Sequence, residues 1–296
     1  MGRKTNKSAR LAAQTSAREK AAAARIAEQR AAQRRRATTI IGGVVVVALI
    51  IGIAVVIALG RHPSSNKVGA ASPALVSQVT SVSQPVADSV GGGGVSAASK
   101  PQTISGTPLG TATKPTLLYI GAEFCPFCAA QRWAMINALS RFGTFTGLRT
   151  IRSSEDNLAT FTFLKAHYTS KYVTFDGKEQ ADQNSKPLQP LTKTEQAQWN
   201  SYIPPGASGP GYPFMDLAGK YVFANFLVDP SLLTGKNWTQ IAAAMAKPTS
   251  ALGKAEIGAA NLITSAICHE NGAQPASVCT APIMNLTNGL SAYTKG

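Results

Sequence analysis

The chain has 296 residues, of which 44 % are hydrophobic and only 15 % are charged, and its formal net charge is +15. This length allows one large or two small domains, and the composition is apolar for a soluble protein. The first 36 residues hold 11 of the 29 Lys and Arg residues and only two acids, so they carry +9 and the remainder +6. No aromatic or base-reading pattern accompanies these basic residues, so we expect no nucleic-acid partner.

Two N-terminal segments are predicted before the folded part. Residues 1–36 are expected to form a basic cytoplasmic arm and residues 37–60 a transmembrane helix. The 20 residues at 40–59 are uncharged and would span about 30 Å as a helix, which matches a bilayer core. A cleaved signal peptide would have a shorter apolar segment. Three arginines at 34–36 precede the helix, so we expect the N-terminus inside and everything after the helix outside the cytoplasm.

The next segment, residues 61–112, is predicted to be an extracytoplasmic linker. It is poor in aromatic residues and rich in Ser, Gly, Ala, Val and Pro, and the four glycines at 91–94 have no side chains to pack. The spacing of apolar residues near 74–82 indicates a possible short helix within it.

Regular elements are predicted from residue 114 onward. The apolar run PTLLYIGAEF at 115–124 predicts a buried strand, and AAQRWAMINALSRFG at 129–143 has the spacing of a helix. The pattern then predicts a strand at 148–153, helix and irregular structure near 156–168, a polar, proline-rich insertion at about 169–211, a hairpin turning at Gly219, a helix at 238–246 and a last helix at 257–267.

The order strand, Cys-x-x-Cys, helix carries the chemistry. Cys125 begins the helix, where unpaired backbone N–H groups and the helix dipole lower the pKa of a thiol. Cys128 follows one turn later, close enough to form a disulfide or to resolve a mixed one. Pro126 suits the first helical turn because no N–H is needed there. The sequence therefore predicts Cys125 as the nucleophile and Cys128 as the resolving thiol.

With these elements in place, the stretch from about 115 to 248 resembles the thioredoxin-like superfamily. The segments YIGAEFCPFCAAQRW, ALSRFG, PFMDLAGKY and ICHENGAQPASVC resemble, more narrowly, a family of uncharacterised, membrane-anchored prokaryotic thioredoxin-like proteins. The resemblance implies an α/β fold with one preceding transmembrane helix: a thioredoxin-like domain at 113–250, the insertion, and a C-terminal helical extension at 251–296. It also implies that Pro213, directly before the hairpin, follows a cis peptide bond and faces the active cysteines.

The chain departs from thioredoxins at several positions near the motif. Phe124 stands in place of the usual Trp. Tyr119 stands where thioredoxins carry a buried Asp that assists proton transfer to the second cysteine, which puts fast reductase turnover in doubt. Pro126 and Phe127 are more similar to glutaredoxins than to strong oxidants. Together with Glu123 they are candidates for modulating the thiol pKa, although an acid at position 123 is more often simply a solvated loop residue.

A second cysteine pair, Cys268 and Cys279, lies near the C-terminus. Thiols outside the cytoplasm tend to oxidise and four cysteines divide into two pairs, so we predict a structural disulfide that pins the last helix. Two alternatives are open: a second redox relay that exchanges electrons with Cys125, and a metal site of Cys125, Cys128, Cys268 and His269.

Together these features predict a membrane-anchored, extracytoplasmic thiol–disulfide oxidoreductase that acts on envelope proteins and needs no cofactor or metal. By analogy, an integral-membrane protein would be its electron partner. Two other classes fit: a module that binds copper or another soft metal through the CPFC thiolates, and a structural domain with two non-catalytic disulfides. The position of Cys125 at a helix start argues against the structural class, because a purely structural bridge does not need that electrostatic setting.

Overall fold

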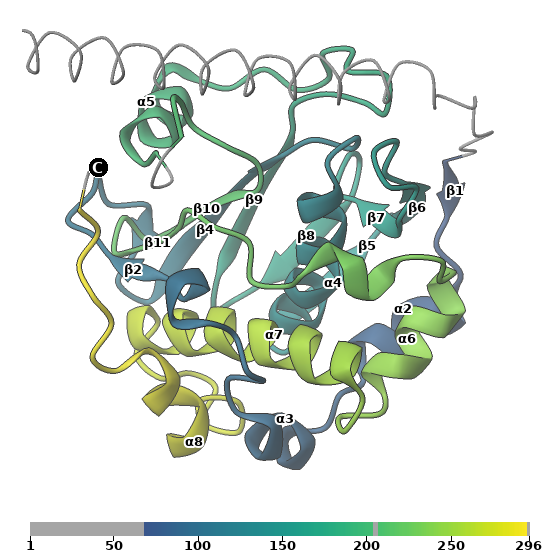
Figure 1. Ribbon diagram of the computed structural model, residues 1–296. Coiled ribbons are helices and arrows are strands. Elements are labelled where there is room, and N and C mark those ends of the chain that lie inside the picture. Colours follow the sequence, from purple (N-terminus) through teal and green to yellow (C-terminus); the bar gives the residue numbers. More distant parts are fainter. Residues whose placement is uncertain (1–67, 204–206, 295–296) are drawn as a thin grey trace, which may run out of the picture. The chain divides into compact units, whose positions relative to one another are not determined.

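The computed structural model describes residues 68–203 and 207–294. The predicted arm at 1–36 and transmembrane helix at 37–60 lie outside the described residues. Within the described ranges, none of the helices has the length and apolar character needed to cross a bilayer. The described part is a mixed α/β structure with seven helices and three sheets (Figure 1).

The largest sheet has six strands and is organised around β4 (Lys114–Gly121), which confirms the predicted strand before the motif. On one side of β4 lies β9 (Thr174–Glu179), which pairs with it in parallel. On the other side β10 (Phe214–Leu217) pairs with it antiparallel. β10 and β11 (Tyr221–Phe223) form the predicted hairpin.

The remaining strands of this sheet are short. β2 (Gln102–Thr103) pairs with β11, and β3 (Gly110–Thr111) pairs with the start of β4. The hairpin turn between β10 and β11 places Ala218 and Gly219 at positive φ, 59° and 69°. Glycine adopts this conformation without steric cost, which is why the sequence marks the turn at residue 219.

Alternate residues of β4 face opposite sides of the sheet, as the pleat of a strand requires. Leu117 and Tyr119 lie in the large core, which also contains α4 (Pro126–Ser140) and α7 (Ala251–Glu270). Leu118 lies in a smaller cluster on the other face. Both faces are therefore covered, which accounts for the nearly continuous apolar run of this strand.

The segment predicted as an insertion, 169–211, contains two regular elements. α5 (Lys193–Ser201) begins with a capping box and covers the smaller cluster, toward which Trp199 packs. β9 is part of the central sheet itself. The sequence did not indicate this strand because TFDGKE is polar and contains Gly177. Its position depends on pairing with the edge of β4, which no local pattern reveals.

The helix predicted near 156–168 is wrong. This stretch forms β7 (Ala159–Thr162) and β8 (His167–Ser170). All four residues of β7 are buried, and the β-branched and aromatic side chains in ATFT favour a strand once they are enclosed. β7 pairs with β6 (Arg149–Arg152), which confirms the strand predicted at 148–153.

The two small sheets complete the strand inventory. β6 lies between β7 and the short β1 (Gly69–Ala70) in a three-stranded sheet. β8 pairs with β5 (Gly143–Thr146), which directly follows α4.

Part of the predicted linker packs on this core. The helix expected near 74–82 is present as α2 (Pro73–Thr80), whose Val79 is fully buried. α3 (Gln84–Val90) follows it. The glycines expected to lack packing contacts are packed by their backbone: a Cβ on Gly93 would collide with the backbone of α7 at Gly258. The missing side chains are therefore what allows this close approach.

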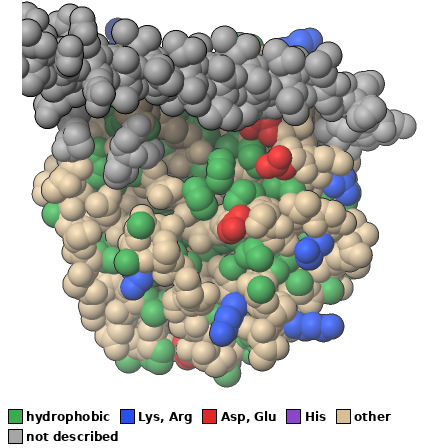
Figure 2. Space-filling view, in the orientation of Figure 1, with side chains coloured by type: hydrophobic (Ala, Val, Ile, Leu, Met, Phe, Trp, Pro, Cys, Tyr) green, Lys and Arg blue, Asp and Glu red, His purple; other side chains and the backbone are tan. Residues whose placement is uncertain are grey.

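The C-terminal part is helical, as predicted. α6 (Trp238–Met245) has a capping box at its start and packs against α7, and α8 (Ala281–Met284) follows the second cysteine pair. Single 3₁₀ turns occur at Ala97–Ser99, Pro230–Leu233 and Asn285–Thr287. On the face shown in the space-filling view, hydrophobic side chains gather near the centre (Figure 2).

Candidate functional site

Cys125 and Cys128 are brought together at the start of α4, as the motif predicts. Cys125 is the N-cap residue, and its Sγ accepts the backbone N–H of Cys128 at 3.3 Å. Pro126 and Phe127 occupy the first helical turn between them. Both cysteines are free thiols; Cys125 is 4 % exposed and Cys128 is fully buried. Cys125 therefore lies just beneath the protein surface, and Cys128 lies deeper in the protein.

The two thiols are electrostatically unequal. The hydrogen bond from the Cys128 thiol lowers the pKa of Cys125, and the N–H groups of Cys128 and Phe127 and the charge of Arg132 act in the same direction, against burial. Burial and the neighbouring Cys125 raise the pKa of Cys128 well above its usual value. The first thiolate therefore forms at Cys125, which is the assignment expected for a nucleophile.

Pro213 lies opposite the motif. The Tyr212–Pro213 peptide bond is cis, as predicted. The Cys125 Sγ lies 3.9 Å from the Tyr212 carbonyl oxygen, to which its thiol can donate. This backbone, which leads into β10, therefore lines the Cys125 sulfur directly.

Aromatic side chains surround the cysteines. Phe124 contacts the Tyr212 ring edge-on at 6.2 Å between centroids, and Tyr212 stacks on Trp199 at 5.1 Å. Phe127 packs against Phe226 with centroids 4.5 Å apart. Phe124, Phe127 and Tyr212 are only partly buried and pack against the cluster that contains both cysteines. The surroundings of Cys125 are thus apolar and partly accessible.

Behind Cys128 lies a buried ion pair that the sequence analysis missed. Arg132 Nε and Nη2 donate to Glu179 Oε1 and Oε2 at 2.9 and 2.6 Å, and both side chains have no exposed surface. Arg132 Nη2 also donates to the Ala122 carbonyl at 2.8 Å, and Glu179 Oε1 accepts the Phe163 N–H. Arg132 stands one helical turn after Cys128, a spacing that was visible in the sequence, but its partner lies on β9.

Glu123 is buried, which contradicts its interpretation as a solvated loop acid. It is 3 % exposed, and its Oε1 accepts the Thr162 hydroxyl at 2.7 Å. Burial raises the pKa of Glu123 above its usual range. Strand β7, which supplies Thr162, was predicted as helix, so the burial of this carboxyl could not be predicted from the sequence.

The second cysteine pair is a disulfide, as predicted. Cys268, in the last turn of α7, is bonded to Cys279, with 5.5 Å between their Cα atoms. Cys268 is therefore not available as a ligand in the four-residue metal site considered with His269, whose ring nitrogen instead lies 2.9 Å from the Met284 carbonyl. In the described part of the chain, no cluster of three or more His, Cys, Asp or Glu side chains is arranged to hold a metal ion.

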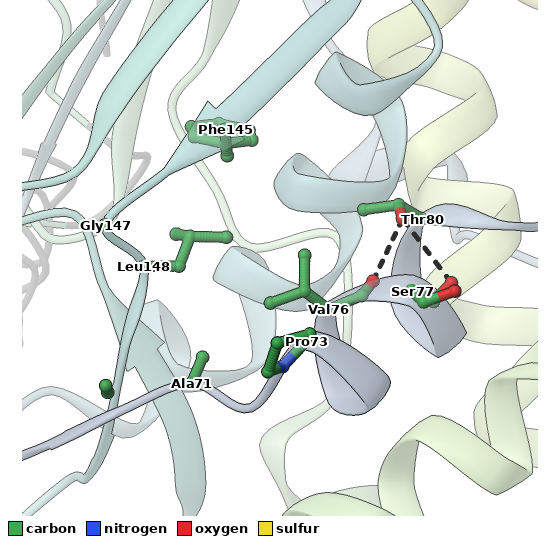
Figure 3. Close-up of a pocket in the computed structure, with 9 residues that line it drawn as sticks. Ala71, Pro73, Val76, Ser77, Thr80, Phe145, Gly147 and Leu148 are labelled. Atoms are coloured by element: carbon green, nitrogen blue, oxygen red, sulfur yellow. Dashed lines mark hydrogen bonds between the residues drawn. The ribbon is translucent and has the colours of Figure 1, made fainter.

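A separate surface cavity of about 560 Å³ lies between α2 and the β5–β6 connection. Val76 and Pro73 from α2 face Phe145 and Leu148 across it (Figure 3). None of its lining residues belongs to the cysteine site.

Comparison with known proteins relates part of the chain to a family model. Neither the curated proteins nor the solved structures contain a match to this chain. Residues 100–208, which include β4, both cysteines of the motif, α4 and β9, match the family model described as a domain of unknown function, DUF929.

Proposed function

We propose that the chain is a thiol–disulfide oxidoreductase with a thioredoxin-like domain, acting through Cys125 and Cys128. The observation that carries the proposal is the N-cap position of Cys125, whose sulfur accepts the Cys128 N–H and whose pKa is lowered while that of Cys128 is raised. A pair with this asymmetry provides one attacking thiolate and one thiol held in reserve.

The strand order supports the thioredoxin-like assignment. In the central sheet the order is β9, β4, β10, β11, with β9 parallel to β4 and the hairpin antiparallel to it. The motif follows β4, α4 packs in the large core, and the cis Pro213 precedes β10. The strand before the motif, the helix after it and the proline before the hairpin are the elements that the resemblance in sequence implies, whereas β9 lies in the segment that the resemblance treats as an insertion.

The geometry suggests the following exchange. The Cys125 thiolate attacks one sulfur of a substrate disulfide, a mixed disulfide forms, and the other substrate sulfur leaves as a thiolate. Cys128 then attacks the Cys125 sulfur, so that the substrate is released as a thiol and the Cys125–Cys128 disulfide forms. The reverse sequence donates a disulfide. The apolar side chains of Phe124, Phe127 and Tyr212 fit a protein substrate with an exposed apolar segment.

The proposed location is the outer face of the cell membrane. The uncharged run at 37–60 and the arginines at 34–36 support a single-pass anchor with the cysteines outside. The substrates would then be thiols or disulfides of envelope proteins, and an integral-membrane protein would exchange electrons with the domain.

Trapping tests the proposed function. We expect Cys125→Ser to reduce exchange with a model disulfide to the uncatalysed rate. We expect Cys128→Ser to accumulate mixed disulfides in cells, visible on non-reducing gels, because the resolving thiol is lost. The double variant is the matched control and should trap nothing. Absence of adducts with Cys128→Ser, together with unchanged exchange by Cys125→Ser, would refute the proposal.

The reduction potential of the Cys125–Cys128 pair gives the direction of electron flow. Equilibration of the full chain with glutathione buffers measures it. A value near −120 mV, roughly that of a strong periplasmic oxidant, means that the protein donates disulfides, and a value near −270 mV, roughly that of thioredoxin, means that it reduces them.

A further inference from the structure

Cys128 has to react as a thiolate in a fully buried position. The titratable and charged groups that face it come from four elements. Cys125 and Arg132 share its helix, Tyr119 comes from β4, Tyr212 comes from the segment before β10, and Glu179 on β9 acts through its ion pair with Arg132. Of these groups, the positive charge of Arg132 favours the thiolate of Cys128, whereas burial and Cys125 oppose it.

Tyr119 directs its hydroxyl toward Cys128. Its side chain is fully buried, and apart from the Cys128 thiol its hydroxyl has no hydrogen-bond partner among the described residues. The Tyr119 ring lies over Gly121, two residues further along the same face of β4. A Cβ at Gly121 would collide with the Tyr119 hydroxyl, so the glycine is what leaves room for it. Gly121 is paired in register with Glu179 on β9, so the hydroxyl lies at the level of the buried ion pair.

The electrostatics of Tyr119 agree with this geometry. Burial raises the pKa of Tyr119 well above its usual value, against the nearby charge of Arg132. Cys128 raises it further, because a thiolate there favours the neutral hydroxyl that can donate to it. Tyr119 is therefore a hydrogen-bond donor at neutral pH and not a base.

One nitrogen of the Arg132 guanidinium makes no hydrogen bond to a described residue. Nε and Nη2 are taken by Glu179 and by the Ala122 carbonyl, but Nη1 is buried and has no partner within the described part of the chain. Two buried donors without a partner other than the Cys128 thiol thus accompany that thiol. Buried donors without a strong acceptor are costly, and a thiol is a weak acceptor, so their retention is explained by a stronger acceptor in another state of the protein.

We propose that Tyr119 and Arg132 are positioning residues that stabilise the Cys128 thiolate when it resolves a mixed disulfide, an inference that rests on the proposed function. Glu179 holds the guanidinium in place, and Gly121 leaves the space that the Tyr119 hydroxyl occupies. In the dithiol state the two donors have no charged acceptor, and the thiolate supplies one.

The step balances without a further reactant. The Cys128 thiol gives up its proton, its sulfur attacks the Cys125 sulfur, and the bond between Cys125 and the substrate sulfur breaks. The substrate sulfur takes up the proton and leaves as a thiol. The two cysteines lose two electrons in total, and the substrate disulfide gains them.

Tyr119→Phe tests the inference, because it removes only the hydroxyl. We expect the pKa of Cys128 to rise in the reduced full chain, as followed by the ¹³Cβ chemical shift of labelled cysteine through a pH titration. We also expect the resolution of a preformed mixed disulfide between Cys125 and glutathione to slow by about tenfold at neutral pH, since hydrogen bonds to charged groups are the strong ones. The slowing should diminish as the pH rises toward the pKa of Cys128.

One further variant is a control and another is a second test. As the control, Tyr168→Phe removes a half-buried tyrosine hydroxyl, which donates to the Leu139 carbonyl, and should leave the titration of Cys128 unchanged. Arg132→Met combined with Glu179→Gln removes the ion pair without leaving a single buried charge, and should raise the pKa of Cys128 as Tyr119→Phe does.

The outcomes separate this inference from the proposed function. An unchanged Cys128 titration in both Tyr119→Phe and the Arg132/Glu179 double variant overturns the inference, even if Cys128→Ser traps substrates. A raised pKa in these variants supports the inference. If no exchange is found in the unaltered chain, the proposed function fails, while the titration still reports on the cluster.

Discussion

At the scale of single residues, position in the backbone decides how each cysteine behaves. Cys125 and Cys128 are three residues apart and of the same chemical type, yet one has a lowered and the other a raised pKa. The difference arises because the N-cap sulfur accepts backbone N–H groups, whereas the next turn of the helix is enclosed by β4 and the buried ion pair.

Asp216 shows a similar effect of enclosure away from the cysteines. Its Oδ1 accepts the Gly219 N–H at 2.9 Å, and Gln198 Nε2 donates to its Oδ2 at 3.4 Å. Burial raises the pKa of Asp216 from 3.8 to about 7, although the Gly219 N–H lowers it. The folded state therefore keeps this proton to higher pH than the unfolded state. The free energy of unfolding must then fall as the pH rises through the window between these two values.

Asp216→Asn should remove this pH dependence. The new amide keeps an acceptor for Gly219, and rotation of the Gln198 amide offers it Oε1, which now has no partner among the described residues. We expect the free energy of unfolding of the variant to exceed that of the unaltered protein by roughly 3–4 kcal/mol above pH 7 and by little at pH 4. Chemical denaturation at a series of pH values measures the difference. Glu123 and Glu256 shift in the same direction, so only the difference between the two proteins is informative; a difference independent of pH would contradict the assignment.

At the scale of elements, α7 joins the parts of the described structure. It packs against α4 and α6, and the turn at Gly93 lies directly against its backbone. Asn261 on α7 also anchors α3, because its Nδ2 donates to the carbonyls of Ala87 and Gly91 at 2.7 and 2.8 Å. Its last turn carries Cys268. The disulfide to Cys279 therefore holds the C-terminal segment to the helix with the widest set of contacts.

Replacement of both cysteines by alanine tests the structural role of this disulfide. The bond closes a loop with a sequence separation of 11, for which loop entropy predicts a loss of about 2–4 kcal/mol in the free energy of unfolding. We expect Cys268→Ala/Cys279→Ala to unfold at a lower denaturant concentration and to retain exchange through Cys125. Loss of exchange in a variant that is still folded would instead indicate the redox relay.

At the scale of the whole molecule, the proposed topology predicts which part is accessible from outside the cell. With protease added to intact cells, the domain after residue 60 should be digested and a tag at residue 1 should be protected, because the arginines at 34–36 remain in the cytoplasm. Permeabilised cells provide the control, in which the tag should also be lost. Protection of the domain in intact cells would reverse the proposed orientation.

How far the sequence predicts the described structure depends on the range of the signal. β4, the start of α4 and the hairpin at Gly219 were predicted, because an apolar run, a Cys-Pro pair and a turn glycine act on their immediate neighbours. The stretch that forms β7 was predicted as helix. It forms a strand because its Thr and Phe side chains are buried in the folded protein, and the local sequence does not reveal that burial.

By itself, the sequence predicted the Cys-x-x-Cys motif at a helix start and the pairing of the other two cysteines, and its resemblance to thioredoxin-like proteins predicted the cis bond before Pro213. Only the tertiary structure decided the surroundings of Cys128. Arg132 and Glu179 are 47 residues apart in the sequence. Glu179 lies on β9, whose polar sequence does not predict a strand and which is defined by its pairing with β4. The sequence shows that Tyr119 replaces the Asp of thioredoxins, but only the structure shows that its hydroxyl lies above Gly121 and near the Arg132–Glu179 ion pair. Local propensity cannot encode such contacts, because burial and charge pairing exist only after distant segments have met.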